Sequence, residues 1–325
     1  REFDPMGLKE VFTFWSPVAP RTVFRGIYEL KPGHYGILKE GTLEEKPYYY
    51  IRFPEKNKNH TTTLEENAEK LKNHLTKAVK LRFTRSDVPV GAYLSGGLDS
   101  SITTAIIAQV TDTPLKTFSL RFSDSEFDEG AYQQQMVAHL GTEHKDVAVS
   151  YKDIGLIFPT VIRHTERPIL RTAPAPLFLL SKLVRESGYK VVVTGEGADE
   201  VLAGYDIFRE EKVRRFLSRD PQSAKRGNII LTLSPWMAHS LGQAPAFAKA
   251  FFAKALDPGD PGFSHRPRWN TTSGILKMVS PDMLKEMKKN DVIQELFNTL
   301  PGEEKGWDSL SRSQYIEMVT LLSGY

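Results

Sequence analysis

A glycine-containing turn at residues 95–101, Ser-Gly-Gly-Leu-Asp-Ser-Ser, limits the fold of this chain more than any other stretch. An apolar segment at 88–94 precedes the turn, and a segment at 101–110 with helical spacing of apolar residues follows it. A glycine pair at such a strand-to-helix junction lets the backbone approach a ligand closely, because no Cβ intrudes. The first amides of a helix are unpaired and lie at its positive end, so this junction suits a phosphate chain.

The same residues also allow a plainer interpretation, a tight turn with Asp99 or Ser100 as the helix N-cap. Their spacing is neither the G-x-x-x-x-G-K-[ST] phosphate-binding loop, whose lysine is absent, nor G-x-G-x-x-G. The hydroxyl groups of Ser95, Ser100 and Ser101 add hydrogen-bond donors to the turn. The sequence alone therefore favours a phosphate site and leaves the simple turn open.

Strand and helix patterns alternate after residue 64, which predicts an α/β fold with a parallel sheet and helices on both faces. Ligands of such sheets bind beyond the carboxyl ends of the strands, where the 95–101 turn lies. The predicted strands are 88–94, 115–122, 144–149 and 189–194. The predicted helices are 64–83, 101–110, 132–140 (ending at Gly141), 154–164 and 175–186.

The first fifty residues are predicted to be β-rich. Residues 21–30 and 34–39 have the pattern of a hairpin closed by the turn Lys31-Pro32-Gly33. So short a segment buries little by itself, and we expect it to pack on another part of the protein. The polar stretch 55–63 has the composition of a linker.

Beyond about residue 205 the pattern becomes helical and less regular. Residues 209–215, Arg-Glu-Glu-Lys-Val-Arg-Arg, are predicted to form a solvated charged face of a helix. Residues 263–269 combine arginine, histidine and tryptophan, but one such stretch does not indicate nucleic-acid binding.

Composition narrows the function classes further. A length of 325 residues favours two or more domains, and a net charge of +3 is too small to argue for nucleic acid or a membrane surface as partner. The chain has no cysteine, which excludes disulfides, thiolate metal sites and cysteine nucleophiles. No apolar run approaches the roughly 20 residues of a membrane span.

A second informative turn, Gly195-Glu196-Gly197-Ala198-Asp199-Glu200, follows an apolar strand pattern ending at Thr194. Its three carboxylates are the oxygen ligands that hold Mg²⁺ beside substrate phosphates, and a cation would offset their repulsion of a polyphosphate. Acidic residues also occur at helix N-termini for dipole reasons alone, although such a start needs no glycines. A dinucleotide fingerprint is the rival interpretation, but Glu200 stands where its third glycine belongs.

Together these motifs resemble the ATP-pyrophosphatase (PP-loop) domain of glutamine-hydrolysing asparagine synthetases, in their bacterial and archaeal form. The resemblance extends over nearly the whole chain and rests on these stretches: VFTFWSPVAPRTVFRGIYELKPGHY, SGGLDSS, FDEGAYQQQMVAHLGTEH, ERPILRTAPAPLFLLSKL, GEGADEVLAGYDIF and FSHRPRW. SGGLDS by itself is also typical of argininosuccinate, GMP and NAD synthetases. The resemblance implies an adenine nucleotide alpha hydrolase-like fold.

The resemblance also implies a domain organisation. Residues 1–55 would be the β-rich end of a glutaminase domain and its linker, and 56–325 the synthetase domain, with an α/β nucleotide core at 64–205 and a helical part at 206–325. The remaining glutaminase domain, with its cysteine nucleophile, is expected before Arg1. Further helices, one carrying a phosphate-contacting lysine, are expected after Tyr325, so the piece 1–325 is expected to have little or no activity alone.

The implied reaction joins aspartate and ammonia at the expense of ATP, through β-aspartyl-AMP, and gives asparagine, AMP and pyrophosphate. The implied cofactors are ATP and Mg²⁺, and the ammonia would come from glutamine in the whole protein. The family resemblance implies a cytoplasmic ligase and is compatible with a homodimer. It gives no role to nucleic acid or a membrane.

The resemblance assigns roles to individual residues. Asp99 and Asp199 match Mg²⁺ ligands, and Glu196 matches an essential glutamate that orients the intermediate or accepts a proton from ammonia. Arg171 matches an arginine that would pair with the aspartate carboxylate, with a surface ion pair as the alternative. The expected nucleotide-binding residues are Tyr93, Ser95, Gly96, Gly97, Leu98, Asp99, Ser100, Ser101, Leu120, Thr194 and Gly195.

Two other functions stay open at this point. A relative with the same fold could act on a different carboxylate, as β-lactam synthetases and peptide cyclases do. A non-catalytic remnant that binds nucleotide or a partner subunit is the other alternative, against which the presence of Asp99, Glu196 and Asp199 argues.

Overall fold

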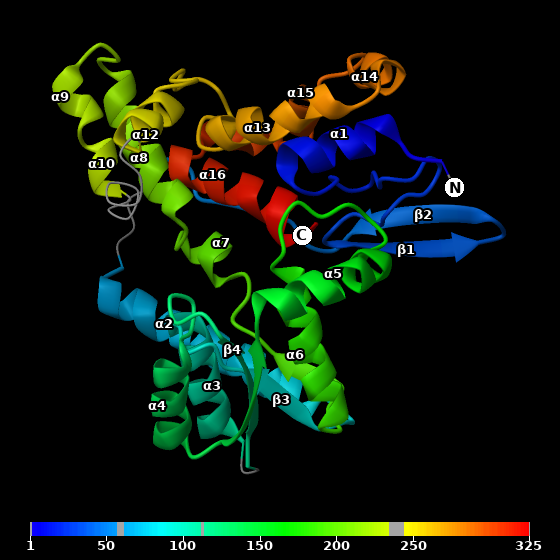
Figure 1. The fold of residues 1–325 in the computed structure, drawn as a ribbon, viewed down its shortest axis with the longest axis vertical. Coiled ribbons are helices and arrows are strands. Elements are labelled where there is room, and N and C mark those ends of the chain that lie inside the picture. Colours follow the sequence, from blue (N-terminus) through cyan, green and yellow to red (C-terminus); the bar gives the residue numbers. More distant parts are fainter. Residues whose placement is uncertain (1, 57–61, 112–113, 234–243, 325) are drawn as a thin grey trace. The chain divides into compact units, whose positions relative to one another are not determined.

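The computed structural model describes residues 2–56, 62–111, 114–233 and 244–324 (Figure 1). The chain forms two compact units, residues 59–196 and residues 1–58 together with 197–325. The N-terminal segment therefore belongs with the C-terminal helices. Its assignment to a glutaminase domain stays a prediction.

The unit 59–196 contains a four-stranded parallel sheet with the strand order β5-β4-β3-β6. Its strands are β3 (Val90–Tyr93), β4 (Lys116–Phe122), β5 (Glu143–Val149) and β6 (Val191–Val193). Its helices are α2 (Leu64–Thr84), α3 (Leu98–Val110), α4 (Gly130–Leu140), α5 (Tyr151–Thr165) and α6 (Pro174–Glu186). The predicted alternation and the parallel sheet are confirmed.

Helices cover both faces of this sheet, as predicted (Figure 1). Because successive strand residues point to opposite faces, Ala92 packs against α2 and α3 while Tyr93 packs toward α6. One core contains Val79, Ala92, Ile106, Ile107 and Leu115, and the other contains Phe118, Leu180 and Val184. Burying each large apolar side chain contributes about 1.5–3 kcal/mol to stability.

Local signals fix the ends of several helices in this unit. Thr63 and Glu66 form a capping box at the start of α2, and Ser150 and Asp153 form one at the start of α5. Helix α4 ends at Gly141, whose φ of 63° is left-handed, as its glycine predicts. Helix α3 begins at Leu98, earlier than the predicted residue 101, so the helix starts within the glycine-containing turn.

The other unit is mainly helical. It contains α1 (Pro5–Phe14), the strands β1 (His34–Lys39) and β2 (Thr42–Pro47), and the helices α7 (Ala198–Leu202), α8 (Asp206–Ser218), α9 (Ala224–Gly227), α10 (Ile230–Leu233), α12 (Ala244–Phe252), α13 (Arg266–Thr272), α14 (Pro281–Met287), α15 (Val292–Asn298) and α16 (Ser309–Glu317). Short 3-10 helices occupy Ser273–Met278 and Gly302–Gly306, and a short π-helix occupies Met318–Leu322. Phe14, Trp269, Val292, Leu296 and Ile316 form one core of this unit, and Leu217, Ile230, Ala248 and Phe252 form another.

The N-terminal segment differs from its prediction in two ways. Residues 5–14 form helix α1, which Asp4 caps by accepting hydrogen bonds from the backbone N–H groups of Met6 and Gly7. The predicted hairpin exists, but residues 34–39 pair with 42–47 instead of 21–30. Only isolated bridges join residues in the 21–30 stretch, one of them between Arg21 and Tyr28.

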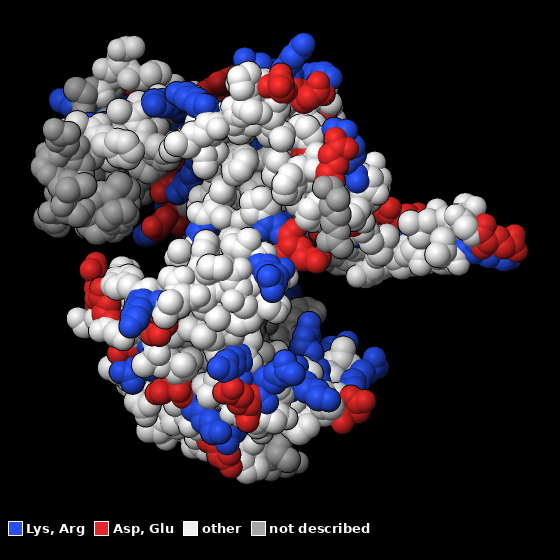
Figure 2. Space-filling view, turned by 45° about the vertical axis from the view of Figure 1, so that its right-hand side comes forward, with Lys and Arg blue, Asp and Glu red and all other residues white. Residues whose placement is uncertain are grey.

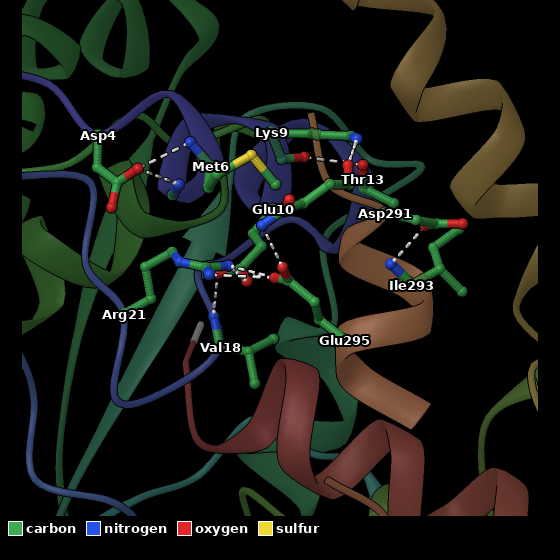
Figure 3. Close-up of polar contacts among 12 residues, drawn as sticks. Asp4, Met6, Lys9, Glu10, Thr13, Val18, Arg21, Asp291, Ile293 and Glu295 are labelled. Carbon is green, nitrogen blue, oxygen red and sulfur yellow. Dashed lines mark hydrogen bonds and ion pairs between the residues drawn. The ribbon is translucent and has the colours of Figure 1, made fainter. Parts of the chain in front are cut away.

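A polar cluster joins α1 to the C-terminal helix α15 (Figure 3). Arg21 forms ion pairs with Glu10 of α1 and with Glu295 of α15, the latter at 3.1 Å. Glu10 also accepts a hydrogen bond from the backbone N–H of Val18 at 2.9 Å. Burial raises the pKa of Glu10 to about 7, against the lowering effect of the Val18 and Arg21 hydrogen bonds. We therefore expect the stability of this cluster to depend on pH.

The predicted solvated face of residues 209–215 is wrong. Glu210, Glu211 and Arg214 of α8 are all buried. Arg214 donates hydrogen bonds to the carbonyl oxygens of Phe252, Phe263, Lys254 and Ala255. These carbonyls lie 38 to 49 residues away along the chain, so the local pattern gave no sign of them.

Residues 263–269 do not form a basic surface patch. Phe263, Ser264, His265 and Trp269 are buried, and His265 Nε2 lies 2.6 Å from Glu317 Oε2. On the face drawn in Figure 2, acidic and basic side chains are intermixed. Within the described part of the chain, no helix has the length and apolar character needed to cross a membrane.

Candidate active site

The 95–101 turn follows strand β3 at its carboxyl end and requires glycine at one position. Gly96 has a φ of +87°, a conformation that other residues adopt at a cost. A Cβ there would lie 2.9 Å from Tyr132 Cβ and 3.0 Å from Gln133 N. The start of α4 therefore lies directly against the turn and leaves no room for a side chain.

No side chain caps the backbone N–H groups at the N-terminus of α3, as a phosphate site requires. Its N-cap is Gly97, which supplies no side-chain hydrogen bond, so the interpretation with Asp99 or Ser100 as N-cap is wrong. The first-turn amides of α3 therefore keep their capacity to bind an anion. Asp99 lies in this first turn.

Two of the predicted hydroxyl donors shape the turn itself. Ser95 Oγ accepts a hydrogen bond from Gly97 N at 3.2 Å and lies 2.8 Å from Ser100 Oγ. Ser100 Oγ also accepts from Ser95 N at 3.1 Å. Ser101 Oγ is buried and has no hydrogen-bond partner among the described residues.

The second turn meets the first because β6 is the parallel neighbour of β3. A Cβ on Gly195 would lie 3.0 Å from both Asp99 Cβ and Ser100 N, so Gly195 allows this close approach. Glu196 is exposed, and its backbone N–H donates to Thr194 Oγ1 at 3.3 Å. Within the unit 59–196, the structure thus brings Thr194, Gly195 and the first turn of α3 together.

Asp199 lies in α7, which belongs to the other unit. Gly204 N donates to the carbonyl oxygen of Asp199 at 2.9 Å, and a Cβ on Gly204 would lie 2.0 Å from Asp199 Oδ1. Glycine at 204 therefore leaves space for the Asp199 carboxylate. The joint binding of Mg²⁺ by Asp99 and Asp199 stays a prediction, and the described residues contain no group of three or more His, Cys, Asp or Glu that could hold a metal ion.

The third carboxylate of the second turn has a structural environment. Glu200 is buried and accepts a hydrogen bond from the Tyr205 hydroxyl at 3.2 Å. Burial raises the pKa of Glu200, and the nearby charges of Glu317 and Asp199 act in the same direction. Glu200 thus has a hydrogen-bond partner within its own unit, the Tyr205 hydroxyl.

The remaining predicted residues occupy several elements of the unit 59–196. Tyr93 is the last residue of β3, and its hydroxyl lies 3.3 Å from Ser181 Oγ. Leu120 lies in β4, Leu98 is exposed at the start of α3, and Arg171 is exposed between α5 and α6. Their contacts with nucleotide or aspartate stay predictions.

Sequence reasoning missed Gln133 of α4. Its side chain is buried, and its Nε2 donates to Leu120 O at 2.8 Å and to Ser95 O at 3.3 Å. Three consecutive glutamines occupy 133–135, and only the first is buried. The helical register of α4 relative to the sheet would have been needed to single it out.

Residues 70–325 match the family model described as asparagine synthase. The chain belongs to the asparagine synthase family. The family is one of ATP-dependent, amide-forming synthetases, and the predicted resemblance to it is confirmed.

Curated members of this family extend the match to the N-terminal segment. Asparagine synthetase [glutamine-hydrolyzing] 1 of Bacillus subtilis is 25% identical over 99% of this chain and 48% of its own length. Amidase chyE of Penicillium rubens is 33% identical, over 60% of this chain and 31% of its own length. The chain thus spans about half the length of the curated synthetase, and less of the amidase.

Among solved structures, an NH3-dependent NAD synthetase from Campylobacter jejuni aligns with 72% of this chain and 96% of its own. The TM-score is 0.32 and the sequence identity 16%, values too low to support an argument. The family assignment rests on the family model.

Proposed function

We propose that this chain is the synthetase part of an asparagine synthetase, which converts aspartate, ATP and ammonia to asparagine, AMP and pyrophosphate. The observation that carries the proposal is the start of α3, which has no side-chain cap and which Gly195 approaches closely at the carboxyl ends of the neighbouring strands β3 and β6. The family match supports the same reaction class.

The residues at the turn fit a pyrophosphate group. Backbone N–H groups in the first turn of α3 supply donors. Hydrogen bonds to a charged group are worth about 1.5–3 kcal/mol each, so a few of them give measurable affinity. The turn lacks the lysine that reaches the β- and γ-phosphates in P-loop enzymes, which favours cleavage between the α- and β-phosphates.

In the proposed reaction, a side-chain carboxylate oxygen of aspartate attacks the α-phosphorus and pyrophosphate leaves. The donors at the start of α3 stabilise the charge that accumulates on the leaving pyrophosphate. Asp99 and Asp199 would hold Mg²⁺, which supplies charge neutralisation between the phosphates and the carboxylates. Arg171 would pair with the aspartate carboxylate through its planar guanidinium group.

In the second half-reaction, ammonia attacks the activated carbonyl carbon and AMP leaves. The attacking nitrogen must lose a proton, and Glu196 is exposed beside Gly195 and the α3 turn, where it could accept that proton or orient the intermediate. Use of glutamine requires a cysteine thiolate, and this chain has no cysteine. We therefore propose that residues 1–325 depend on free ammonia.

The amidase relatives support a second candidate, an enzyme of the same family that acts on a different carboxylate. Amidase chyE is 33% identical to this chain, whereas the asparagine synthetase of Bacillus subtilis is 25% identical. The same turns would activate that carboxylate, and the difference would lie in the residues that bind the rest of the substrate, such as Arg171.

The test incubates the protein with ATP, Mg²⁺ and ammonium, with aspartate in one arm and other amino-acid carboxylates in parallel arms. AMP and pyrophosphate formed only with aspartate would support asparagine synthesis. The same products with another carboxylate would favour the second candidate. ADP and phosphate as the main products would refute the proposed mechanism.

A further inference from the structure

We propose that Gln133 is a positioning residue that holds the nucleotide-binding turn in register with strand β4. This inference rests on the proposed function for its effect on nucleotide binding. The geometry itself belongs wholly to the unit 59–196.

Gln133 bridges the point at which β3 leaves the sheet. The pairing of β3 with β4 ends at Tyr93 and Phe118, with one further backbone hydrogen bond from Leu94 N to Phe118 O at 3.0 Å. Beyond it, the chain of β3 turns toward α3. Ser119 Oγ of β4 donates to Leu94 O, and the Gln133 amide donates to a carbonyl further along each strand segment, Ser95 O and Leu120 O. The Gln133 side chain thus links the two strand segments beyond their last backbone hydrogen bond.

The orientation of the Gln133 amide follows from its surroundings. Both groups within hydrogen-bond distance of its Nε2 are carbonyl oxygens, which only accept. A flipped amide would direct its own oxygen at these two carbonyls. Gln133 Oε1 is buried without a partner among the described residues, so the side-chain hydrogen bonds of Gln133 found there all come from its Nε2.

Helix α4 gives this side chain a fixed base. Gln133 lies in the first turns of α4, and its backbone N is one of the atoms that exclude a Cβ at Gly96. The loop before α4 is tied to β4, because Arg121 donates to both carboxylate oxygens of Asp128 at 2.8 and 2.7 Å. Arg121 also fills the space beside Gly130, where a Cβ would lie 2.2 Å from its Cζ. These contacts fix the start of α4 against β4. The hydrogen bond from the Gln133 side chain to Ser95 O then connects α4 to the 95–101 turn.

The test compares Gln133→Met, which keeps the length of the side chain and removes its donors, with Gln134→Met and Gln135→Met. The two control positions are exposed on the same helix. Hydrogen exchange of the 95–100 amides is measured on the ATP-free full chain, and Mg-ATP affinity is measured by calorimetry. We expect faster exchange and about tenfold weaker binding for Gln133→Met only, the loss typical of one hydrogen bond.

A second variant guards against a folding defect in the first. Gln133→Glu has the same shape, and its carboxyl group donates only when it is protonated. We expect its Mg-ATP affinity, relative to wild type at each pH, to recover as the pH falls, a profile that a packing role would not produce. Circular dichroism checks that each variant folds.

The outcomes separate the inference from the proposed function. Exchange rates equal to wild type in Gln133→Met, or faster exchange with unchanged Mg-ATP affinity, would overturn the positioning role. Wild-type protein that fails to bind Mg-ATP would overturn the proposed function. In that case the exchange rates still decide whether Gln133 holds the turn.

Discussion

Replacing Gly96 by alanine tests the central feature of the proposed site. The substitution adds one carbon at a backbone with φ of +87°. That carbon would lie 2.9 Å from Tyr132 Cβ, 3.0 Å from Gln133 N and 3.2 Å from Tyr132 C. Two of these atoms belong to the backbone of α4, so they cannot rotate away. The turn must therefore move away from α4 or distort.

The magnitude follows from two separable terms. A left-handed conformation costs an L-residue about 1–2 kcal/mol. Overpacking a filled site costs about 1–3 kcal/mol more. We expect Gly96→Ala to lower the free energy of unfolding by about 2–5 kcal/mol. If the shift of the turn also removes one hydrogen bond to a phosphate, worth about 1.5–3 kcal/mol, the affinity for Mg-ATP falls by about 10- to 150-fold.

Gly188 provides a matched control in the same unit. Its φ is +83°, and a Cβ there would meet nothing within 4 Å. Gly188→Ala should therefore show the conformational cost alone and leave nucleotide binding unchanged. Urea unfolding of both variants and wild type gives the stability terms, and calorimetry with Mg-ATP gives the affinities.

The comparison has a clear point of failure. If Gly96→Ala were no less stable than Gly188→Ala and bound Mg-ATP like wild type, α4 would not confine the turn as described. If Gly188→Ala weakened binding as strongly as Gly96→Ala, the effect would come from general loss of stability rather than from the turn.

Three further predictions concern the metal ligands, pH and the buried arginine. Asp99→Asn and Asp199→Asn should each lower the rate of pyrophosphate release 10²- to 10³-fold, because each variant would lose a charge-stabilising contact. Circular dichroism should stay unchanged. Near-normal turnover in either variant would show that the replaced aspartate is not a metal ligand. Folding raises the pKa of Glu10 from 4.5 to about 7, so between these pH values the carboxyl group is protonated in the folded state and ionised in the unfolded state. The free energy of unfolding should therefore fall as the pH rises from about 4.5 through 7. In urea unfolding at pH 5 and pH 8, the advantage of wild type over Glu10→Gln should shrink by about 2.5 kcal/mol, and an equal advantage at both pH values would contradict the raised pKa. Arg214→Met should destabilise by about 1–3 kcal/mol for each carbonyl left unpaired, and a loss below 1 kcal/mol by urea unfolding would show that these bonds contribute little.

The parallel sheet was predictable because its signals are local. Apolar strands, capping residues such as Ser150 and the terminal Gly141 all act within a few residues of the element that they define. The start of α3 was placed too late because its N-cap is a glycine, which carries no capping side chain for the sequence to reveal.

The errors arose where one pattern fits two structures. Residues 11–15, Val-Phe-Thr-Phe-Trp, are typical of a strand by composition, yet they belong to the end of α1 and its cap. Asp4 and Pro5 before them form a helix start, and Val11 and Phe14 are spaced to share the buried face. A helix start is thus encoded at Asp4 and Pro5, and the prediction of a β-rich segment did not take it into account.

The candidate site divides in the same way between local and distant causes. The position of the 95–101 turn between β3 and α3 was predictable because its glycines and the apolar strand before it are local signals, and phosphate binding by the turn stays a prediction. Its confinement depends on α4, more than thirty residues later, through the Gly96 contact with Gln133 N and the hydrogen bond from Gln133 to Ser95. A local motif thus predicts which residues could contact a ligand. The residues that hold the motif in position can be identified only once it is known how separate helices and strands pack. Variants at Gln133 and Gly96 probe that second set, and an effect on nucleotide binding there would show that the packing of α4 is part of the site.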